Sequence, residues 1–345
     1  MSVEDVVRAC VGDPRAEVAE QHEEHVASGA LSTAALRRLH GTTKDGVPWS
    51  FVVKSIMSMK HWEGMDMVPE HLREAAVAHF PWRADADVYL CPPPLPPGFR
   101  LPVLYLMEDL GDDRMNMWME DVDAARDGWD LTRYRRAARL LGELASLRPA
   151  RGPNLGMRYY IDGPLRNAFL PLLRDPATWR HPLVAEHADP LLRADLLSLA
   201  ERIEPLMAAL DRLPHTMPHG DACPQNLLVP TDGSADFVAI DWGWPHAAPV
   251  GFDLGQLLVG LAQAGATDPE DLPAIHETIE AAYLGQVDAD PADVSFGYVA
   301  SLVLRSAWQA LPLERLGEEV TPELEQLFAR RAALARFIVD LGRGL

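Results

Sequence analysis

One stretch of the sequence carries acidic and amide side chains at a spacing that suits chemistry on a phosphate group. It reads His-Gly-Asp at residues 219–221, reaches Asn226 five residues later, and closes with Ile-Asp-Trp-Gly at residues 240–243. Carboxylate and amide oxygens are the ligands that magnesium prefers. Phosphoryl transfer also needs a carboxylate that accepts the proton of the attacking hydroxyl. The pattern therefore predicts Asp221 as the base, with Asn226 and Asp241 as metal ligands.

The elements around these residues are expected to bring them together. Two short apolar runs flank a turn-rich segment that contains Asp232-Gly233, which is typical of a β-hairpin. Asn226 begins the first predicted strand and Asp241 ends the second, so antiparallel pairing places them about 5 Å apart. Asp221 lies on the loop just before Asn226, and it adds a third oxygen-bearing side chain at the same edge.

The rest of the chain divides into a part with strands and a part with helices. The first thirty residues have a helical pattern with a break at residues 12–14. A strand-turn-strand hairpin is predicted next, with its turn at residues 40–46, and a helix is predicted to open at Pro69. A proline-rich turn at residues 92–98 separates two further predicted strands, the second at residues 103–107.

From about residue 130 the apolar periodicity is mostly helical. Strands concentrated early and helices concentrated late indicate an α+β chain. We expect a small, sheet-bearing lobe at residues 1–109 that binds nucleotide. The larger, mainly helical lobe at residues 110–345 would carry the catalytic residues and bind the substrate.

The motifs together resemble the aminoglycoside phosphotransferase and choline kinase-like superfamily. The resemblance rests on residues 219–221, Asn226 and residues 240–243, with Gly-Phe-Asp-Leu-Gly at residues 251–255 as a third element. Gly220 stands where protein kinases carry arginine, and Trp242 where they carry phenylalanine, which points to small-molecule substrates. The resemblance implies a bilobal protein-kinase-like fold and a kinase that uses ATP, with GTP as an open alternative, and Mg²⁺.

The resemblance also implies roles for individual residues. Lys54 would contact the nucleotide phosphates, oriented by Glu74 or, one turn earlier, by Glu70. The loop around Thr42 and Thr43 would cover the phosphates, although an ordinary hairpin turn would look the same. The backbone of a hinge would meet the adenine edge, and the residues expected there are Met107, Glu108 and Leu110.

Supporting roles and the acceptor follow from the same resemblance. His219 would brace the catalytic loop, and Asp253 would cap its helix and hydrogen-bond that loop. The predicted acceptor is an aminoglycoside or another antibiotic-like molecule, with a sugar, amino sugar or amino alcohol as the alternative. Candidate acceptor contacts are Asp112, Asp113 and Trp244.

Composition limits the other partners. The formal net charge of −20 argues against nucleic acid and anionic membranes, which are held by clustered lysine and arginine. The three cysteines are scattered without metal-ligand spacing, and the acidic N-terminus does not resemble a signal peptide. We therefore expect a cytoplasmic protein, either a monomer or a homodimer, with no membrane partner.

Other classes of protein remain open at this point. A nucleotide-binding pseudokinase would keep the fold without turnover, although retention of Lys54, Asp221, Asn226 and Asp241 weighs against it. A metal-dependent hydrolase could use the same carboxylates, but it would act without ATP. A protein kinase is disfavoured, because the short segment between Gly243 and Asp253 leaves no room for an activation loop.

Overall fold

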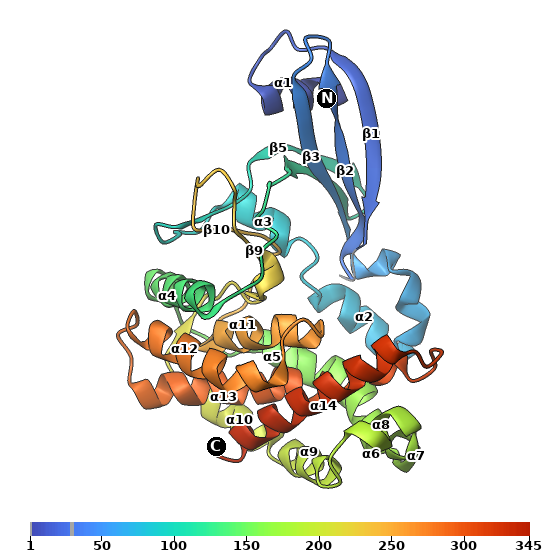
Figure 1. The fold of residues 1–345 in the computed structure, drawn as a ribbon, viewed down its shortest axis with the longest axis vertical. Coiled ribbons are helices and arrows are strands. Elements are labelled where there is room, and N and C mark those ends of the chain that lie inside the picture. The colour runs from blue at the N-terminus through green and yellow to red at the C-terminus, as the bar shows by residue number, and fades with distance from the viewer. Residues whose placement is uncertain (1, 28–30) are drawn as a thin grey trace. The chain divides into compact units, whose positions relative to one another are not determined.

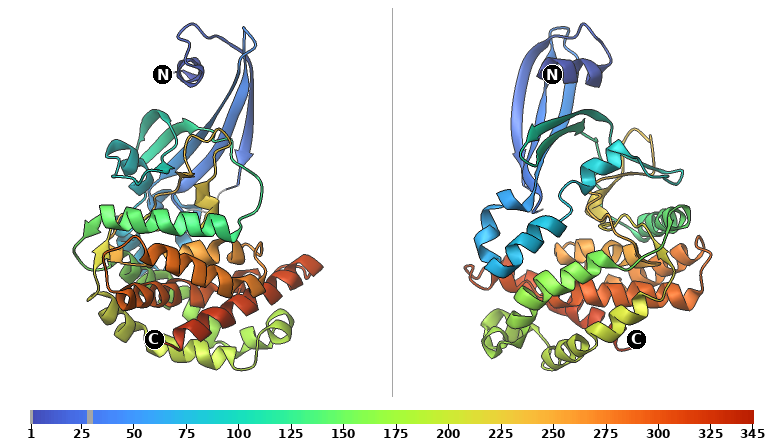
Figure 2. Two further views of the ribbon diagram at one scale, coloured as in Figure 1. Left: turned by 60° about the vertical axis from the view of Figure 1, so that its left-hand side comes forward. Right: turned by 180° about the vertical axis from the view of Figure 1, so that it is seen from behind.

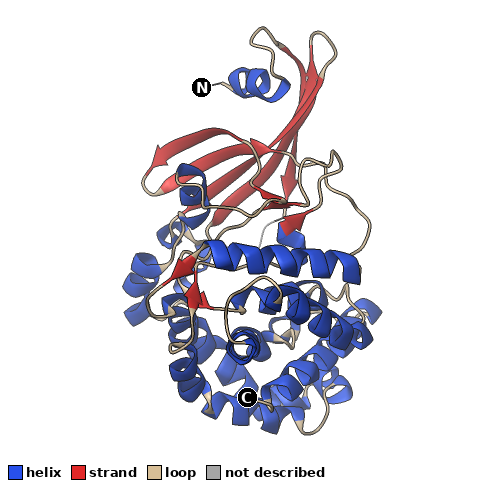
Figure 3. Cartoon of the chain, turned by 90° about the vertical axis from the view of Figure 1, so that its left-hand side faces the viewer, coloured by secondary structure: helices blue, strands red, loops and turns tan. Residues whose placement is uncertain are grey.

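The computed structural model describes residues 2–27 and 31–345, which fall into two compact units. The first unit comprises Met1–Pro93, Arg100–Ala125 and Leu228–Gly243, and the second comprises Pro94–Phe99, Arg126–Leu227 and Trp244–Leu345. Strands gather in the first unit and helices dominate the second, as the sequence predicts (Figure 3). The first unit extends to Ala125, beyond the boundary expected after residue 109.

The first unit is built on an antiparallel sheet of five strands in the order β1-β2-β3-β6-β5 (Figure 1). Its strands are β1 Val18–Val26, β2 Thr33–Thr43, β3 Pro48–Met57, β5 Leu104–Gly111 and β6 Arg114–Glu120. Its helices are α1 Val3–Val11, α2 Glu70–His79 and α3 Ala84–Leu90, with the short turn η1 Met59–His61. A second sheet has the order β4-β10-β9, formed by β4 Phe99–Arg100, β10 Phe237–Ala239 and β9 Leu227–Leu228.

Alternation along β3 gives the sheet two different faces. Phe51 and Val53 are fully buried on one face, in a cluster with residues of α1. Ile56 points to the other face, where it packs with Ala86 of α3 and with Met117 of β6. Lys54 shares this second face, so its ammonium group is directed toward α3 rather than α1.

Three elements of the first unit differ from the sequence predictions. Residues 18–26 form the edge strand β1 rather than a helix, because pairing with β2 overrides the helical tendency of a polar, almost fully exposed segment. Before the proline-rich turn, where a strand was predicted, residues 84–90 form α3 and cover the sheet. Strand β6 was not predicted, although its buried Met115, Met117 and Met119 alternate with more exposed residues.

The second unit is mainly helical, and its central element is α11. The longer helices around it are α4 Leu131–Leu147, α12 Leu272–Leu284, α13 Pro291–Ser306 and α14 Pro322–Gly342, with α11 itself at Phe252–Gln263. All four pack against α11, whose side chains are almost all buried. Helix α4 also lies along α12 (Figure 2). The apolar run that begins at Leu254 is thus part of a core helix.

Shorter elements complete the second unit. They are α5 Leu155–Tyr160, a π-helix at Ile161–Phe169, α6 Leu170–Arg174, α7 Pro176–Arg180, α8 Pro182–His187, α9 Leu192–Glu201, α10 Ile203–Leu210 and the turn η4 Pro224–Asn226. A small sheet has the order β11-β8-β7, formed by β11 Ala248–Pro249, β8 His215–Thr216 and β7 Pro149–Ala150. Among the described residues, no helix is long and apolar enough to cross a bilayer.

Candidate active site

The loop that carries Asp221 is fastened to the core helix α11 by a buried carboxylate. Asp253 accepts hydrogen bonds from the backbone amides of His219, at 3.0 Å, and Gly220, at 2.8 Å. Burial raises the pKa of Asp253, while the two amide hydrogen bonds act in the opposite direction. The expected bond to the loop is thus present. The expected helix cap is not, because Gly251 occupies the N-cap position.

The far end of the same loop is fastened to α11 as well. The side-chain amide of Gln225 donates to the carbonyl oxygen of Gly260 at 3.0 Å. A Cβ atom on Gly260 would lie 2.5 Å from the Cβ of Cys223, so only glycine allows this approach. The loop is therefore held at both ends before it enters β9, immediately after Asn226.

The carboxylate of Asp221 receives one hydrogen bond at each oxygen. Asn226 Nδ2 donates to Oδ2 at 3.0 Å and to the Asp221 carbonyl at 2.9 Å. Arg305 Nη2 donates to Oδ1 at 3.1 Å, and its Nη1 donates to the carbonyl of Gly220. The buried ring of His219 accepts from the Asp221 amide at 3.3 Å, which fits the predicted bracing role. Arg305 was not found from the sequence, because it lies 84 residues away on α13, outside any motif.

Gly220 is required by its backbone and by its neighbour. Its φ of 91° lies in the region that favours glycine, and an added Cβ would overlap the Cβ of Trp244. The ring of Trp244 stacks near Phe252, with a centroid distance of 5.1 Å. The glycine that replaces the arginine of protein kinases thus makes room for a tryptophan close to the catalytic loop.

In the first unit, Lys54 is held between two carboxylates. Its ammonium group lies 2.8 Å from Asp85 Oδ2 and also pairs with Asp241, and its side chain is only 11% exposed. Burial alone would lower the pKa of Lys54, but the carboxylates of Asp85 and Asp241 outweigh burial and raise it. Lys54 therefore stays charged at neutral pH and cannot act as a base.

Asp241 lies at a strained position. Its φ of 60° is uncommon for a residue with a side chain, and conformations of this kind cost about 1–3 kcal/mol and cluster at functional sites. The next residue, Trp242, donates its backbone amide to Asp85 Oδ1 at 3.2 Å. Asp85 therefore binds both Lys54 and the turn that carries Asp241.

The predicted partner of Lys54 is corrected by this arrangement. Glu74 and Glu70 are exposed on α2, a helix with no buried residues. The carboxylate that pairs with Lys54 belongs to Asp85, because α3 is the helix that packs on the face carrying the lysine. The prediction of Glu74 as the partner was therefore wrong.

The predicted phosphate-covering loop lies at the wrong end of the sheet. Thr42 pairs with Pro48, six residues along β3 from Lys54, a separation of about 20 Å at roughly 3.3 Å per residue. Thr43 is buried, and its hydroxyl accepts a hydrogen bond within the β2–β3 turn. Because β1 precedes β2, the connection between the first two strands is residues 27–32, part of which lies outside the described residues.

The predicted hinge is also displaced. Met107, Glu108 and Leu110 lie inside β5, where Glu108 pairs with Asn116 of β6 and accepts a 3.0 Å hydrogen bond from its side chain. The chain therefore turns back through β6 and remains in the first unit as far as Ala125. A hinge that follows the last strand of the sheet would fall after residue 120.

Of the predicted acceptor contacts, two are engaged elsewhere in the first unit. Asp112 and Asp113 form the turn between β5 and β6, with φ values of 53° and 56°. Lys60 pairs with both carboxylates, at 2.8 Å and 2.6 Å. The ion pairs with Lys60 account for both acidic residues, and no contact with an acceptor is needed to explain them. Trp244, in contrast, contacts the loop of Asp221.

The predicted metal ligands remain Asn226 and Asp241. Among the described residues, no three His, Cys, Asp or Glu side chains form a metal-binding group. Magnesium bound to a nucleotide needs only one or two protein ligands, since water and phosphate oxygens complete its shell. Asn226 uses Nδ2 on Asp221, which turns its Oδ1 to the opposite side. Asn226 belongs to the second unit and Asp241 to the first.

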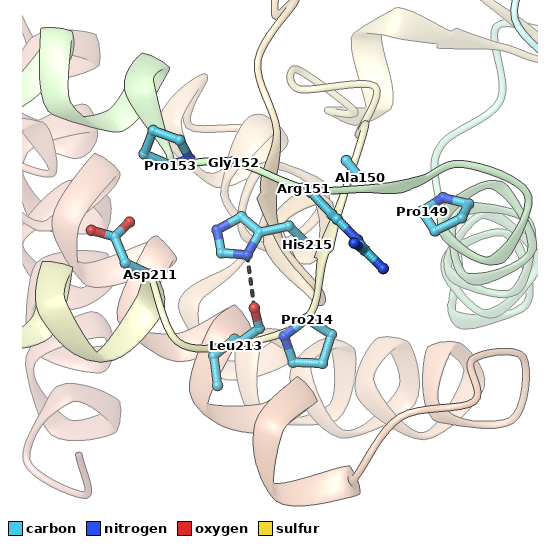
Figure 4. Close-up of a pocket in the computed structure, with 9 residues that line it drawn as sticks. All are labelled: Pro149, Ala150, Arg151, Gly152, Pro153, Asp211, Leu213, Pro214 and His215. Carbon is cyan, nitrogen blue, oxygen red and sulfur yellow. Dashed lines mark hydrogen bonds between the residues drawn. The ribbon is translucent and has the colours of Figure 1, made fainter.

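A separate pocket of about 660 Å³ lies in the second unit (Figure 4). It contains none of the predicted site residues, and the side chain of His215 within it contacts the carbonyl of Leu213 at 2.7 Å. Its lining residues are Pro149, Ala150, Arg151, Gly152, Pro153, Asp211, Leu213, Pro214 and His215. The pocket lies at the start of β8, and the catalytic loop follows the end of that strand.

Comparison with known proteins identifies the class. The model of the phosphotransferase enzyme family matches residues 70–296, which include the catalytic loop, Asp241 and Asp253. The chain belongs to this family, and it is a kinase. The resemblance stated from the motifs is thereby confirmed. A search of curated proteins found no match.

Several solved structures resemble this chain. An aminoglycoside phosphotransferase from Alicyclobacillus acidocaldarius is 17% identical with a TM-score of 0.51, and the match covers 98% of this chain and 95% of that one. An aminoglycoside phosphotransferase from Streptomyces rimosus is 20% identical, with a TM-score of 0.40 and coverages of 87% and 96%. A choline kinase from Cryptosporidium parvum is 12% identical, with a TM-score of 0.48 and coverages of 94% and 90%. The first of these supports the protein-kinase-like fold.

The pairing of Lys54 with Asp85 predicts unequal effects of two substitutions. Asp85→Asn should lower the free energy of unfolding by about 1.5–3 kcal/mol, because it weakens a hydrogen bond to a buried charge. Glu74→Gln, at an exposed position, should change it by less than about 0.5 kcal/mol. Urea unfolding at pH 7 measures both. Because the pKa of Lys54 is raised, the ion pair with Asp85 stabilises the folded protein at neutral pH, and this stabilisation is lost only when the pH rises through the raised pKa of Lys54. The difference in stability between the two variants should therefore persist at pH 9. Equal effects of the two substitutions would show that the pairing of Lys54 with Asp85 does not stabilise the protein.

The close approach at Gly220 predicts a large effect of a single methyl group. Gly220→Ala should lower the free energy of unfolding by about 2–5 kcal/mol, from backbone strain at positive φ and overlap with Trp244. Gly128→Ala is the matched control, because an added Cβ there meets nothing within 4 Å. Thermal unfolding of both variants provides the comparison. A Gly220→Ala protein as stable as the control would show that the loop has room for a side chain.

Proposed function

We propose that the protein transfers the γ-phosphoryl group of ATP, with Mg²⁺, to a hydroxyl of an aminoglycoside or another antibiotic-like small molecule. The observation that carries this proposal is the Asp221 carboxylate, fixed at both oxygens on a loop that α11 holds at two points. A proton acceptor in phosphoryl transfer must be held at hydrogen-bond distance from the attacking hydroxyl. Membership of the phosphotransferase family supports the same reading.

The reaction divides among the residues as follows. Asp221 accepts the proton of the acceptor hydroxyl, while a bond forms from that oxygen to the γ-phosphorus and the bond to the ADP oxygen breaks. Lys54, which carries a fixed positive charge, would contact the nucleotide phosphates. Asn226 and Asp241 would hold Mg²⁺, which neutralises charge on the phosphates when it is bound.

Two observations support the acceptor class. The acidic balance of −20 favours a cationic acceptor, such as an amino-substituted antibiotic. Trp244 is the predicted contact residue that lies next to the catalytic loop, where a sugar ring could pack on its face. A sugar, amino sugar or amino alcohol would use the same catalytic residues, so the acceptor must be found by experiment.

A coupled ADP-release assay tests the proposal. Purified protein with Mg-ATP is presented with aminoglycosides, peptide antibiotics, amino sugars, sugars and amino alcohols, and products are confirmed by mass spectrometry. We expect release that depends on an antibiotic acceptor. If ADP is released only with a sugar or an amino alcohol, the acceptor belongs to that class and not to the antibiotics. If no acceptor works although ATP binds, the protein is a nucleotide-binding pseudokinase, and turnover of a substrate without ATP would identify a hydrolase.

The assigned roles predict different kinetic defects for two aspartates. Asp221→Asn should lower kcat by about 10²–10⁴-fold with little change in the KM for ATP, since it removes the proton acceptor and keeps the shape. Asp241→Ala should instead raise the KM for Mg-ATP by roughly tenfold or more. Steady-state kinetics with varied ATP separates the two, and Glu74→Gln serves as the control. Similar, mild defects in both variants would contradict the division of roles.

A further inference from the structure

Arg305 makes contacts that no sequence motif assigns. It lies in the last turn of α13, and its guanidinium group donates to the Gly220 carbonyl and, at 3.1 Å, to Asp221 Oδ1. Its side chain is 17% exposed, whereas that of Asp221 is 42% exposed. A largely buried cation thus reaches a carboxylate that is otherwise open on one side.

The guanidinium group is itself held in place by two aromatic rings. Its central carbon lies 5.0 Å from the centroid of Trp244 and 5.6 Å from that of Phe252. Cation–π contacts and the planar shape of guanidinium fix the direction of its N–H groups. Arg305 therefore arrives at the catalytic loop with its donors already oriented.

This arrangement completes the support of the Asp221 carboxylate. The oxygen Oδ2 has a donor in Asn226, which is close in sequence, and Oδ1 has a donor in Arg305. With one donor only, the carboxylate could turn about its Cβ–Cγ bond. With a donor at each oxygen its plane is fixed, which leaves the remaining lone pairs for the acceptor hydroxyl.

We propose that Arg305 is a positioning residue of the phosphoryl-transfer reaction, which orients the Asp221 carboxylate toward the acceptor hydroxyl. The proposal rests on the proposed function, because it assigns Asp221 as the proton acceptor. It also gives Trp244 a second role, since the ring that lies near the acceptor also holds the guanidinium group. Arg305 itself does not exchange protons and does not contact the nucleotide in this assignment.

The test compares Arg305 with a matched buried arginine. Arg331 on α14 is also largely buried, and its three donors bind the backbone carbonyls of Gln263, Gln309 and Ala310 without contacting the catalytic loop. Arg305→Ala should lower kcat about 30-fold or more, with the KM for ATP within about threefold. Arg331→Ala should lower stability but leave kcat per folded molecule unchanged.

Chemical rescue separates positioning from a structural role. Guanidinium chloride at about 20 mM should raise the kcat of Arg305→Ala at least about fivefold, because the ion can take the place of the lost group beside Trp244 and Phe252. Urea and sodium chloride at the same concentration should not. If Arg305→Ala does not fold, Arg305→Lys provides the test, with kcat roughly tenfold below wild type because an ammonium group has no planar donor pair. Wild-type kcat in the alanine or the lysine variant, or rescue by urea as well, would overturn the proposal.

A second measurement does not depend on knowing the acceptor. Crystal structures of the wild type and of Arg305→Ala, or of Arg305→Lys if the alanine variant does not fold, should show the Asp221 carboxylate rotated in the variant. An unchanged carboxylate plane would overturn the positioning role even if no acceptor is phosphorylated. A wild-type protein that binds ATP but phosphorylates nothing would instead overturn the proposed function, and the carboxylate orientation would still decide the role of Arg305.

Discussion

The buried carboxylate of Asp253 is the interaction on which the catalytic loop depends. It satisfies the amides of His219 and Gly220 at the point where the chain leaves the small sheet and turns toward Asp221. A buried carboxylate with two backbone donors is costly to displace, because either an amide or a charge would be left without a partner. Since four longer helices pack against α11, the position of Asp221 is set by the core of the second unit rather than by the loop itself.

Around this anchor, three residues form a single steric and electrostatic unit. Gly220 leaves space for Trp244, Trp244 supports the guanidinium group of Arg305, and Arg305 binds the loop next to Gly220. A substitution at any one of the three residues would therefore remove a contact, or the space, on which the other two depend. Gly220 stands where protein kinases have an arginine, and here a positive charge reaches the loop from Arg305 of α13.

The sequence predicted what local patterns encode and missed what depends on distant pairing. The motif from His219 to Gly243 and the β2–β3 hairpin were found, because their turns and spacing are local signals. The strand at residues 18–26 was missed, since an exposed edge strand carries no alternation to read. Because this strand was missed, β2 and β3 were taken as the first two strands. The predicted phosphate-covering loop was therefore placed at the turn between β2 and β3. Asp85 and Arg305 were missed for a related reason: each meets its partner through packing of a helix whose contacts no local pattern specifies.

The first unit is discontinuous in sequence, and this has a consequence for its synthesis. Residues 228–243 supply β10 and Asp241, so a nascent chain that ends at Ala125 lacks one of the two carboxylates that neutralise Lys54. At about 5–20 residues per second, a ribosome needs on the order of ten seconds to cover the intervening segment. During that time the five-stranded sheet is complete but carries an incompletely paired cation in its interior. The amino-terminal part of this protein therefore reaches its final charge balance only after about half of the helical unit has been made.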